Sequence, residues 1–332
     1  MGTDVRTSLK DRLALPVIAA PMFLVSGVDL VAAACMAGVI GSFPTVNCRT
    51  VGELDAWLAE IQNRLARAAD ASGRATAPWC PNLVVHRSNG RLMEDVGALA
   101  RRKPELVITS VGSPAPVLAQ LHDAGAQVFA DVATIRHAER AVEAGADGLV
   151  LLTAGAGGQT GWLNPFAFVR AVRAFFNGPL VLAGGVSDGA ALFAAEAIGC
   201  DFGYMGTKFI ATHESMAKQG YKDLLVQTRA DDILLTRAFT GLDTNMIRSS
   251  IVAAGLNPDR LPAHGAIDIA QDISIESREN RPKRWKDVWS AGHSVSGVAV
   301  VTSAAELVEA TRREYEAARA EFELRLSHKR RD

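Results

Sequence analysis

Short runs of apolar residues alternate with amphipathic stretches through the first two thirds of the chain. The runs are apolar at consecutive positions, which is typical of parallel strands buried on both faces. Between them, apolar residues recur at helical spacing, as in Thr50–Ala69. The eight predicted strands are Leu15–Ala20, Val39–Phe43, Trp79–Val85, Leu106–Thr109, Gln127–Asp131, Gly148–Leu152, Leu180–Ala183 and Phe202–Met205.

Eight strand-helix units that end near residue 212 predict a closed (β/α)8 TIM barrel, a fold of the α/β class. A doubly wound dinucleotide-binding sheet would need a GxGxxG turn directly after the first strand, where this chain has Pro21. The glycine-rich run Gly155–Gly161 follows the sixth strand and leads into a loop, so it does not meet that requirement.

The pattern changes after Thr212, and we divide the chain accordingly. Residues 13–212 and 285–303 are expected to form the barrel. Residues 213–284 are expected to form a helical cover over the active-site face, with helices at Ser215–Val226 and near Met246–Ala254. Residues 304–332 read as a charged C-terminal helix.

Charge and cysteine usage narrow the class of protein. Thirty-five basic and 36 acidic residues leave a net charge of −1, which disfavours nucleic-acid binding. Four scattered cysteines suggest buried, reduced thiols. The seven histidines show no metal-ligand spacing, and no apolar run is long enough to cross a membrane. We expect a cytoplasmic protein with no metal site.

Glycine turns follow the last two predicted barrel strands. Gly184 and Gly185 end the seventh strand, and Gly206-Thr207 ends the eighth. Backbone N–H groups in such turns can approach an anion closely, and TIM barrels commonly bind phosphate there. The other interpretation is two tight turns without a ligand. Because no catalytic triad or metal cluster is evident, the chemistry is expected to come from a cofactor with a phosphate tail.

Several motifs, taken together and in order, resemble the nitronate monooxygenases, once called 2-nitropropane dioxygenases. The resemblance covers roughly residues 13 to 300. The motifs are Ala20-Pro21-Met22 after the first strand, Asn82 on the third, GAGGQTG after the sixth, AGGVSDG after the seventh, MGTKFIAT after the eighth, and WKDVWSAGHSVSG near the end.

The resemblance implies a barrel that binds FMN and oxidises alkyl nitronates with O2 to carbonyl compounds and nitrite. Gly184, Gly185, Gly206 and Thr207 would hold the phosphate. The remaining residues that we assign to the cofactor lie at other strand ends: Ala20, Pro21, Met22, Asn82, Asp131, Gly157 and Gly158. The partners would be a small nitronate or quinone-like substrate and O2, and a homodimer is plausible.

One departure from the family concerns the catalytic base. The family usually has histidine where this chain has Gln159, and an amide cannot take up a proton near neutral pH. Conversely, His293 stands where glutamine is usual. We name both as catalytic candidates, with His293 either a substitute base or a helix-start residue bonded to backbone. The alternatives are an NAD(P)H-dependent flavin reductase of quinones or enoyl thioesters, and a flavin- or phosphate-binding barrel without turnover.

Overall fold

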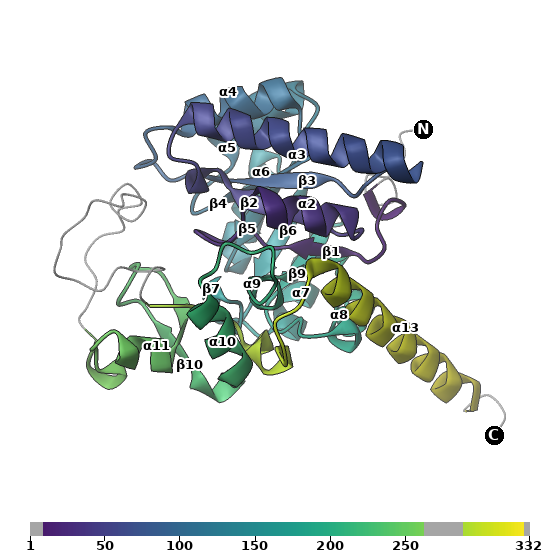
Figure 1. Cartoon of the computed structure of the whole chain (residues 1–332), viewed down its shortest axis with the longest axis vertical. Helices are drawn as coiled ribbons and strands as arrows, with labels where there is room; N and C mark the ends of the chain where they lie inside the picture. Colours follow the sequence, from purple (N-terminus) through teal and green to yellow (C-terminus); the bar gives the residue numbers. More distant parts are fainter. Residues whose placement is uncertain (1–8, 262–287, 329–332) are drawn as a thin grey trace.

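The computed structural model describes residues 9–261 and 288–328 and contains the expected closed barrel of eight parallel strands (Figure 1). The strands pair in chain order, and β9 closes the ring by pairing with β1. The predicted fold class is therefore confirmed. The barrel strands are β1 (Val17–Ala19), β2 (Ile40–Pro44), β3 (Trp79–Val84), β4 (Leu106–Ser110), β5 (Gln127–Val132), β6 (Gly148–Leu152), β8 (Leu180–Ala183) and β9 (Phe202–Met205).

Helices follow the strands and pack around the outside of the barrel (Figure 1). Local sequence signals set several of their ends: the Thr50 side chain accepts a hydrogen bond from the Glu53 N–H at the start of α3, and Asp188 caps α8 in the same way through the Ala191 N–H. These helices are α2 (Val28–Met36), α3 (Val51–Ser72), α4 (Leu92–Arg102), α5 (Ala115–Asp123), α6 (Ile135–Ala144), α7 (Pro165–Arg173), α8 (Gly189–Ala197) and α9 (Thr207–Ile210).

Helix α3 is longer than the sequence suggested. The alanine-rich residues after Ala69, where the predicted helical stretch ended, continue the helix to Ser72. Alanine has the highest helix propensity, and the helix ends only where Gly73 adopts a left-handed φ of +66°.

The barrel interior is apolar along most of the strands and polar at their carboxyl-terminal ends. Its apolar core includes Ile108, Phe129 and Phe202. Side chains alternate across a strand, so the residue two positions further along faces the interior again. At this outer level the inward-facing side chains of four strands are polar: Asn82, Ser110, Asp131 and Tyr204.

We expected the appended segment after α9 to be helical, but it also contains strands. It contains α10 (Gln219–Gln227) and α11 (Arg248–Ala253), but also β10 (Ile233–Thr236) and β11 (Thr244–Ile247). These strands form an antiparallel sheet with β7 (Gly158–Gln159), which lies within the loop after β6. The hydrophobic pattern of the sequence could not reveal this sheet, because its third strand is two residues long and comes from a distant loop.

The last described segment returns to the barrel. Ser290 forms a β-bridge with Met246, and a 3-10 helix, η4 (His293–Gly297), follows. Helix α13 (Ala304–His328) then packs on α2 and α8 before it projects from the body (Figure 1). The boundary that we placed at residues 284 and 285 lies outside the described residues, so the domain division stays a prediction.

Candidate active site

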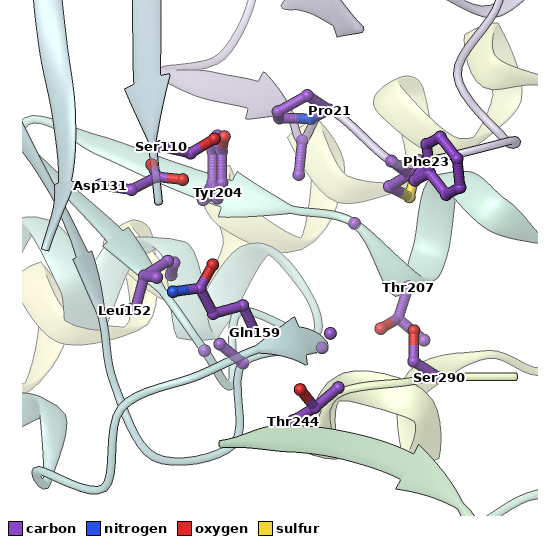
Figure 2. Close-up of a pocket in the computed structure, with 18 of the residues that line it drawn as sticks. Pro21, Phe23, Ser110, Asp131, Leu152, Gln159, Tyr204, Thr207, Thr244 and Ser290 are labelled. Carbon is purple, nitrogen blue, oxygen red and sulfur yellow. The ribbon is translucent and has the colours of Figure 1, made fainter. Parts of the chain in front are cut away.

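A cavity of about 280 Å³ opens at the carboxyl ends of the barrel strands (Figure 2). Barrel loops line one side of it, and the appended segment contributes Tyr221, Leu242 and Thr244. Most of the sequence-predicted site residues line this cavity. They are Ala20, Pro21, Met22, Asn82, Asp131, Gly157, Gly158, Gln159, Gly184, Gly185, Gly206 and Thr207.

The glycine turn after β8 has the backbone geometry of an anion cradle. Gly184 and Gly185 have φ angles of +120° and +77°, which L-residues rarely adopt. A Cβ at Gly184 would lie 2.5 Å from the Thr153 hydroxyl oxygen, whereas a Cβ at Gly185 would enter open space. In the described part of the chain, the N–H groups of Gly184 and Gly185 donate to no protein acceptor. The turn therefore presents free backbone donors to the cavity.

The turn after β9 completes this end of the cavity. Thr207 is buried at the start of α9, and its hydroxyl oxygen accepts a hydrogen bond from the Gly292 N–H at 3.0 Å. This bond ties the C-terminal turn to the barrel. The neighbouring Lys208 does not line the cavity, since its Nζ donates to the Gly297 carbonyl at 2.6 Å. Burial lowers the pKa of Lys208, partly offset by Glu314 and Asp188.

The loop after β1 is held in shape by Asn47. The Asn47 amide group donates to the carbonyls of Met22 (3.1 Å) and Ser26 (2.8 Å), and its oxygen accepts from the Leu24 N–H (2.9 Å). Leu24 has a φ of +59°, a strained value for a residue with a Cβ. Asn47 thus holds a strained loop whose neighbours Met22 and Phe23 line the cavity.

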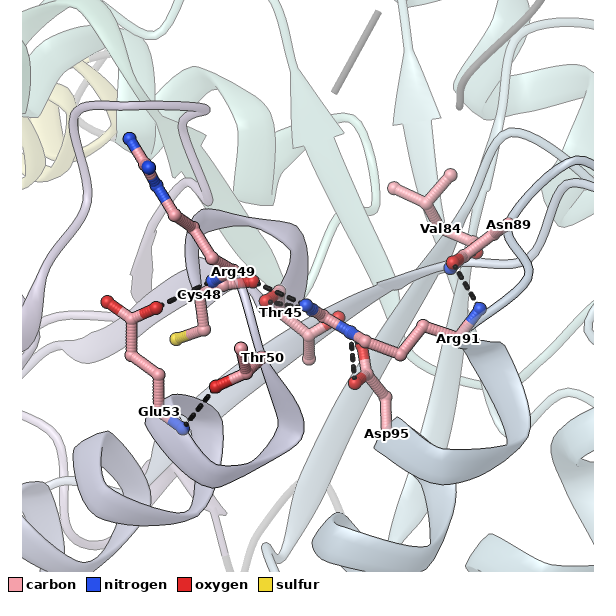
Figure 3. A network of polar contacts seen from close by, with 9 residues as sticks. All are labelled: Thr45, Cys48, Arg49, Thr50, Glu53, Val84, Asn89, Arg91 and Asp95. Carbon is pink, nitrogen blue, oxygen red and sulfur yellow. Dashed lines mark hydrogen bonds and ion pairs between the residues drawn. The ribbon is translucent and has the colours of Figure 1, made fainter. Parts of the chain in front are cut away.

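A buried ion pair in turn supports the segment that carries Asn47 (Figure 3). The Arg91 guanidinium binds both carboxylate oxygens of the buried Asp95 and also donates to the carbonyls of Thr45 and Cys48. Such a two-pronged pair has a well-defined geometry. The start of α4 therefore fixes the turn after β2, which fixes the loop after β1.

Polar side chains meet at the floor of the cavity, on the inner surface of the barrel (Figure 2). The Ser110 hydroxyl donates to Asn82 Oδ1 at 3.1 Å, and the Asn82 amide donates to the Ile108 carbonyl at 3.3 Å. Next to this pair lie Asp131 and Tyr204. Burial raises the pKa of Asp131 to about 8. Burial, with a smaller contribution from Asp131, also raises the pKa of Tyr204.

The two catalytic candidates fall in different places. Gln159 lies on β7, and Figure 2 shows its amide reaching into the cavity toward the side that holds Asp131 and Tyr204. His293 is exposed and does not line the cavity. It begins η4, its N–H donates to the Gly155 carbonyl at 2.9 Å, and its ring lies against Gly155. The structure therefore places His293 as a helix-start residue outside the cavity.

The cavity holds few charges. Among the described residues that line it, none is lysine, arginine or histidine, and Asp131 is the only carboxylic acid. Nor do residues 9–261 and 288–328 contain a group of three or more His, Cys, Asp or Glu that could hold a metal ion. The four cysteines are free and buried, as expected. The described lining therefore offers a ligand hydrogen-bonding groups and apolar contacts but no positively charged side chain.

Comparison with known proteins identifies the family of this chain. The family model for nitronate monooxygenase matches residues 6–311, which is most of the chain. The chain belongs to the nitronate monooxygenase family. It is therefore an oxidoreductase, from a family of flavin enzymes.

Individual relatives of this family member are distant. A nitronate monooxygenase of Paraburkholderia phytofirmans is 29% identical over 90% of this chain and 92% of its own length. A dehydrogenase of a hydroxy-methyl-oxo-octahydroindene-carboxyl-CoA from Rhodococcus jostii is 26% identical over 75% of this chain and 68% of its own.

Solved structures share the fold. The nitroalkane oxidase of Streptomyces ansochromogenes superposes with a TM-score of 0.77 at 23% identity, over 95% of this chain and 99% of that one. FabK from Thermotoga maritima gives a TM-score of 0.76 at 20% identity, over 97% of this chain and 99% of that one.

In the described residues, no helix has the length and apolar character that a membrane span requires.

Some cavity residues of this family member were not anticipated from the sequence. Tyr204 could have been found, because it stands two positions after the inward-facing Phe202 on the same strand. Tyr221 could not, since it reaches the cavity from α10 by stacking on Trp289, with ring centroids 5.0 Å apart, and by donating to the Ser290 carbonyl. Such a contact depends on tertiary packing alone.

Proposed function

We propose that this protein is an FMN-dependent nitronate monooxygenase that oxidises preformed alkyl nitronates with O2 to carbonyl compounds and nitrite. The observation that carries the proposal is the cavity itself, in a chain whose match to the family spans residues 6–311. One end of the cavity offers free backbone donors, and the described residues at the other end offer polar side chains, none of them histidine.

The residues present fit FMN. A phosphate would lie between Gly184-Gly185 and Gly206-Thr207, where backbone donors are free and the missing Cβ of Gly185 leaves space. The ring and ribityl chain would extend toward Pro21, Met22 and Asn82, which line the same cavity. The redox chemistry would come from bound FMN, which can exchange electrons with the substrate and with O2.

Gln159 determines which ionic form of the substrate can react. A neutral nitroalkane must first lose a carbon-bound proton, and a missing base typically lowers the rate about 10²- to 10⁴-fold. A preformed nitronate needs no such step. The Gln159 amide N–H would instead donate to a nitro oxygen and orient the anion. His293 lies outside the cavity, and the described lining residues include no histidine that could replace the missing base.

One observation favours a second candidate, an NAD(P)H-dependent flavin reductase of quinones or enoyl thioesters. Gln159 removes the base needed for proton abstraction but leaves hydride transfer unaffected. The Rhodococcus jostii relative, named as a dehydrogenase of an octahydroindene-carboxyl-CoA, aligns with 75% of this chain, which is consistent with this alternative. A flavin-binding barrel without turnover would show neither activity.

The test compares nitrite release from propyl-2-nitronate and from 2-nitropropane, in wild type, Gln159→His and His293→Gln. We expect wild type to oxidise the nitronate at least 10²-fold faster than the neutral compound. Gln159→His should raise turnover of the neutral compound and change nitronate turnover much less. His293→Gln is the matched control outside the cavity and should match wild type.

Two outcomes would reject the proposal. Equal wild-type rates on both substrates that survive the loss of His293 would show that proton abstraction does not depend on either residue. Rapid NADH or NADPH oxidation with a quinone, without nitrite from either nitro compound, would establish the reductase instead.

A further inference from the structure

Two buried polar atoms at the cavity floor have no hydrogen-bond partner. In the described chain, four buried side-chain oxygens lack one, and two of these, Asp131 Oδ1 and the Tyr204 hydroxyl, belong to cavity-lining residues. Buried polar groups are almost always paired, because an unpaired one costs about 1–3 kcal/mol. The pair therefore indicates that these atoms bind whatever fills the cavity.

The surroundings of Asp131 disfavour its charged form. Among the described residues, the titratable groups that interact with it are the Tyr204 hydroxyl from β9 and the Cys80 thiol from β3, and neither carries a positive charge. No lysine, arginine or histidine is found among the described lining residues. Burial without a cation raises the pKa of Asp131 to about 8, so that the carboxyl group keeps its proton at neutral pH.

We propose that proton-bearing Asp131 and Tyr204 act together as hydrogen-bond donors to the carbonyl oxygens of the bound flavin ring. A neutral carboxylic acid and a phenol each offer one O–H donor. Ser110, the other hydroxyl at the floor, already donates to Asn82. Asp131 thus becomes a positioning residue for the cofactor, an inference that rests on the proposed function.

This role makes cofactor binding depend on pH in a defined direction. When Asp131 loses its proton, it loses its donor and places an uncompensated negative charge beside electron-rich carbonyl oxygens. If only the protonated form binds well, a group that titrates near pH 8 weakens flavin affinity about tenfold between pH 7 and pH 9. Tyr204 does not interfere in this range, since its pKa lies well above its usual value.

The test follows the flavin of the holoenzyme between pH 6 and pH 9.5 by its visible absorption and by the fraction released on ultrafiltration. Wild type should release flavin with a transition near pH 8, and the visible absorption should change as the flavin leaves the protein. Asp131→Asn keeps a donor but cannot ionise, so its transition should disappear. Asp131→Leu should retain flavin more weakly at every pH. The control Asp223→Asn alters an exposed carboxylate on α10 and should leave the transition unchanged.

A second readout is the melting temperature. An Asp with a pKa near 3.8 when unfolded and about 8 when folded holds a proton only in the folded state between these values, so stability falls as pH rises from about 4 to about 8. Asp131→Asn removes this loss, and its melting temperature should exceed that of wild type increasingly toward pH 8. Tyr204→Phe should weaken flavin retention while the transition persists.

The results separate this inference from the proposed function. A flavin transition near pH 8 that persists in Asp131→Asn, or its absence in wild type, would overturn the donor role of Asp131 even if nitrite is produced. A transition that Asp131→Asn abolishes supports the role even if the enzyme releases no nitrite and proves to be a reductase.

Discussion

At the scale of single residues, the site is notable for neutral groups where charge would be expected. Gln159 stands where the family resemblance predicts a base, and Asp131, the only carboxylic acid among the described lining residues, has a pKa that burial raises to about 8. The sequence revealed the first feature, because a motif with one changed residue is readable without a structure. It could not reveal the second, because the protonation of Asp131 depends on which groups surround it in the barrel.

The assignment of Gly185 to the phosphate can be tested against a matched glycine. Gly185 and Gly255 have nearly equal φ angles, +77° and +78°, and a Cβ at either would meet no atom within 4 Å. Gly185→Ala and Gly255→Ala therefore introduce similar backbone strain, about 1–2 kcal/mol. Only the first places a methyl group inside the proposed cradle.

We expect Gly185→Ala to weaken FMN retention about ten- to a hundredfold, the effect of losing one hydrogen bond to a charged group. Gly255→Ala should retain flavin like wild type. The flavin-to-protein absorbance ratio after gel filtration provides the measurement. Equal yellow colour in both variants would show that the phosphate is held elsewhere.

At the scale of elements, the sequence predicted what depends on local pattern and missed what depends on distant pairing. The barrel strands and their helices were located because each carries its own apolar run, cap or glycine, as at Thr50 and Asp188. The sheet of β7, β10 and β11 was missed, since Gly158–Gln159 is a strand only because β11 pairs with it.

The Asn47 clamp makes the loop after β1 depend on the turn after β2. Asn47→Ala should remove the partner of the Leu24 N–H and of the Ser26 carbonyl, which lowers the free energy of unfolding by about 1–3 kcal/mol, while the Met22 carbonyl keeps the Val25 and Ser26 N–H groups as donors. Because Met22 and Phe23 line the cavity, flavin should also dissociate faster. Thermal melts measure the loss of stability. Stopped-flow mixing with an excess of a protein that captures free flavin, such as apoflavodoxin, measures the rate at which flavin dissociates.

The control for this variant is Asn63→Ala, which removes an exposed amide from α3. It should match wild type in both measurements. If Asn47→Ala loses stability but releases flavin at the wild-type rate, the clamp supports the fold without shaping the cavity.

At the scale of the whole molecule, the polar end of the closed barrel forms the floor of the cavity. On the outside of the barrel, α13 packs against α2 and α8 (Figure 1). We predicted α13 as a charged helix. Its first half is buried through Ala304, Leu307, Val308 and Thr311, while the described residues from Arg319 onward are exposed. The helix therefore packs against the barrel with its first half and is exposed to solvent along its second half.

Gly189 determines how closely α13 can approach the barrel. A Cβ there would lie 2.1 Å from the Tyr315 N atom and 2.3 Å from the Thr311 carbonyl oxygen, so any side chain must displace α13. Gly97 on α4 is the matched control, because a Cβ there comes no closer than 3.7 Å to the flexible Arg101 side chain. Alanine should stabilise a free helical site by roughly 0.5–1 kcal/mol.

Gly97→Ala should therefore raise the melting temperature slightly. Gly189→Ala should lower the free energy of unfolding by about 1–3 kcal/mol, as overpacking does, and expose α13 to limited proteolysis. Its flavin content should stay close to wild type, because α13 contributes no residue to the cavity in the described chain. Two glycine variants that melt alike, with α13 equally resistant to protease, would show that α13 adapts to the extra methyl group and does not depend on this close contact.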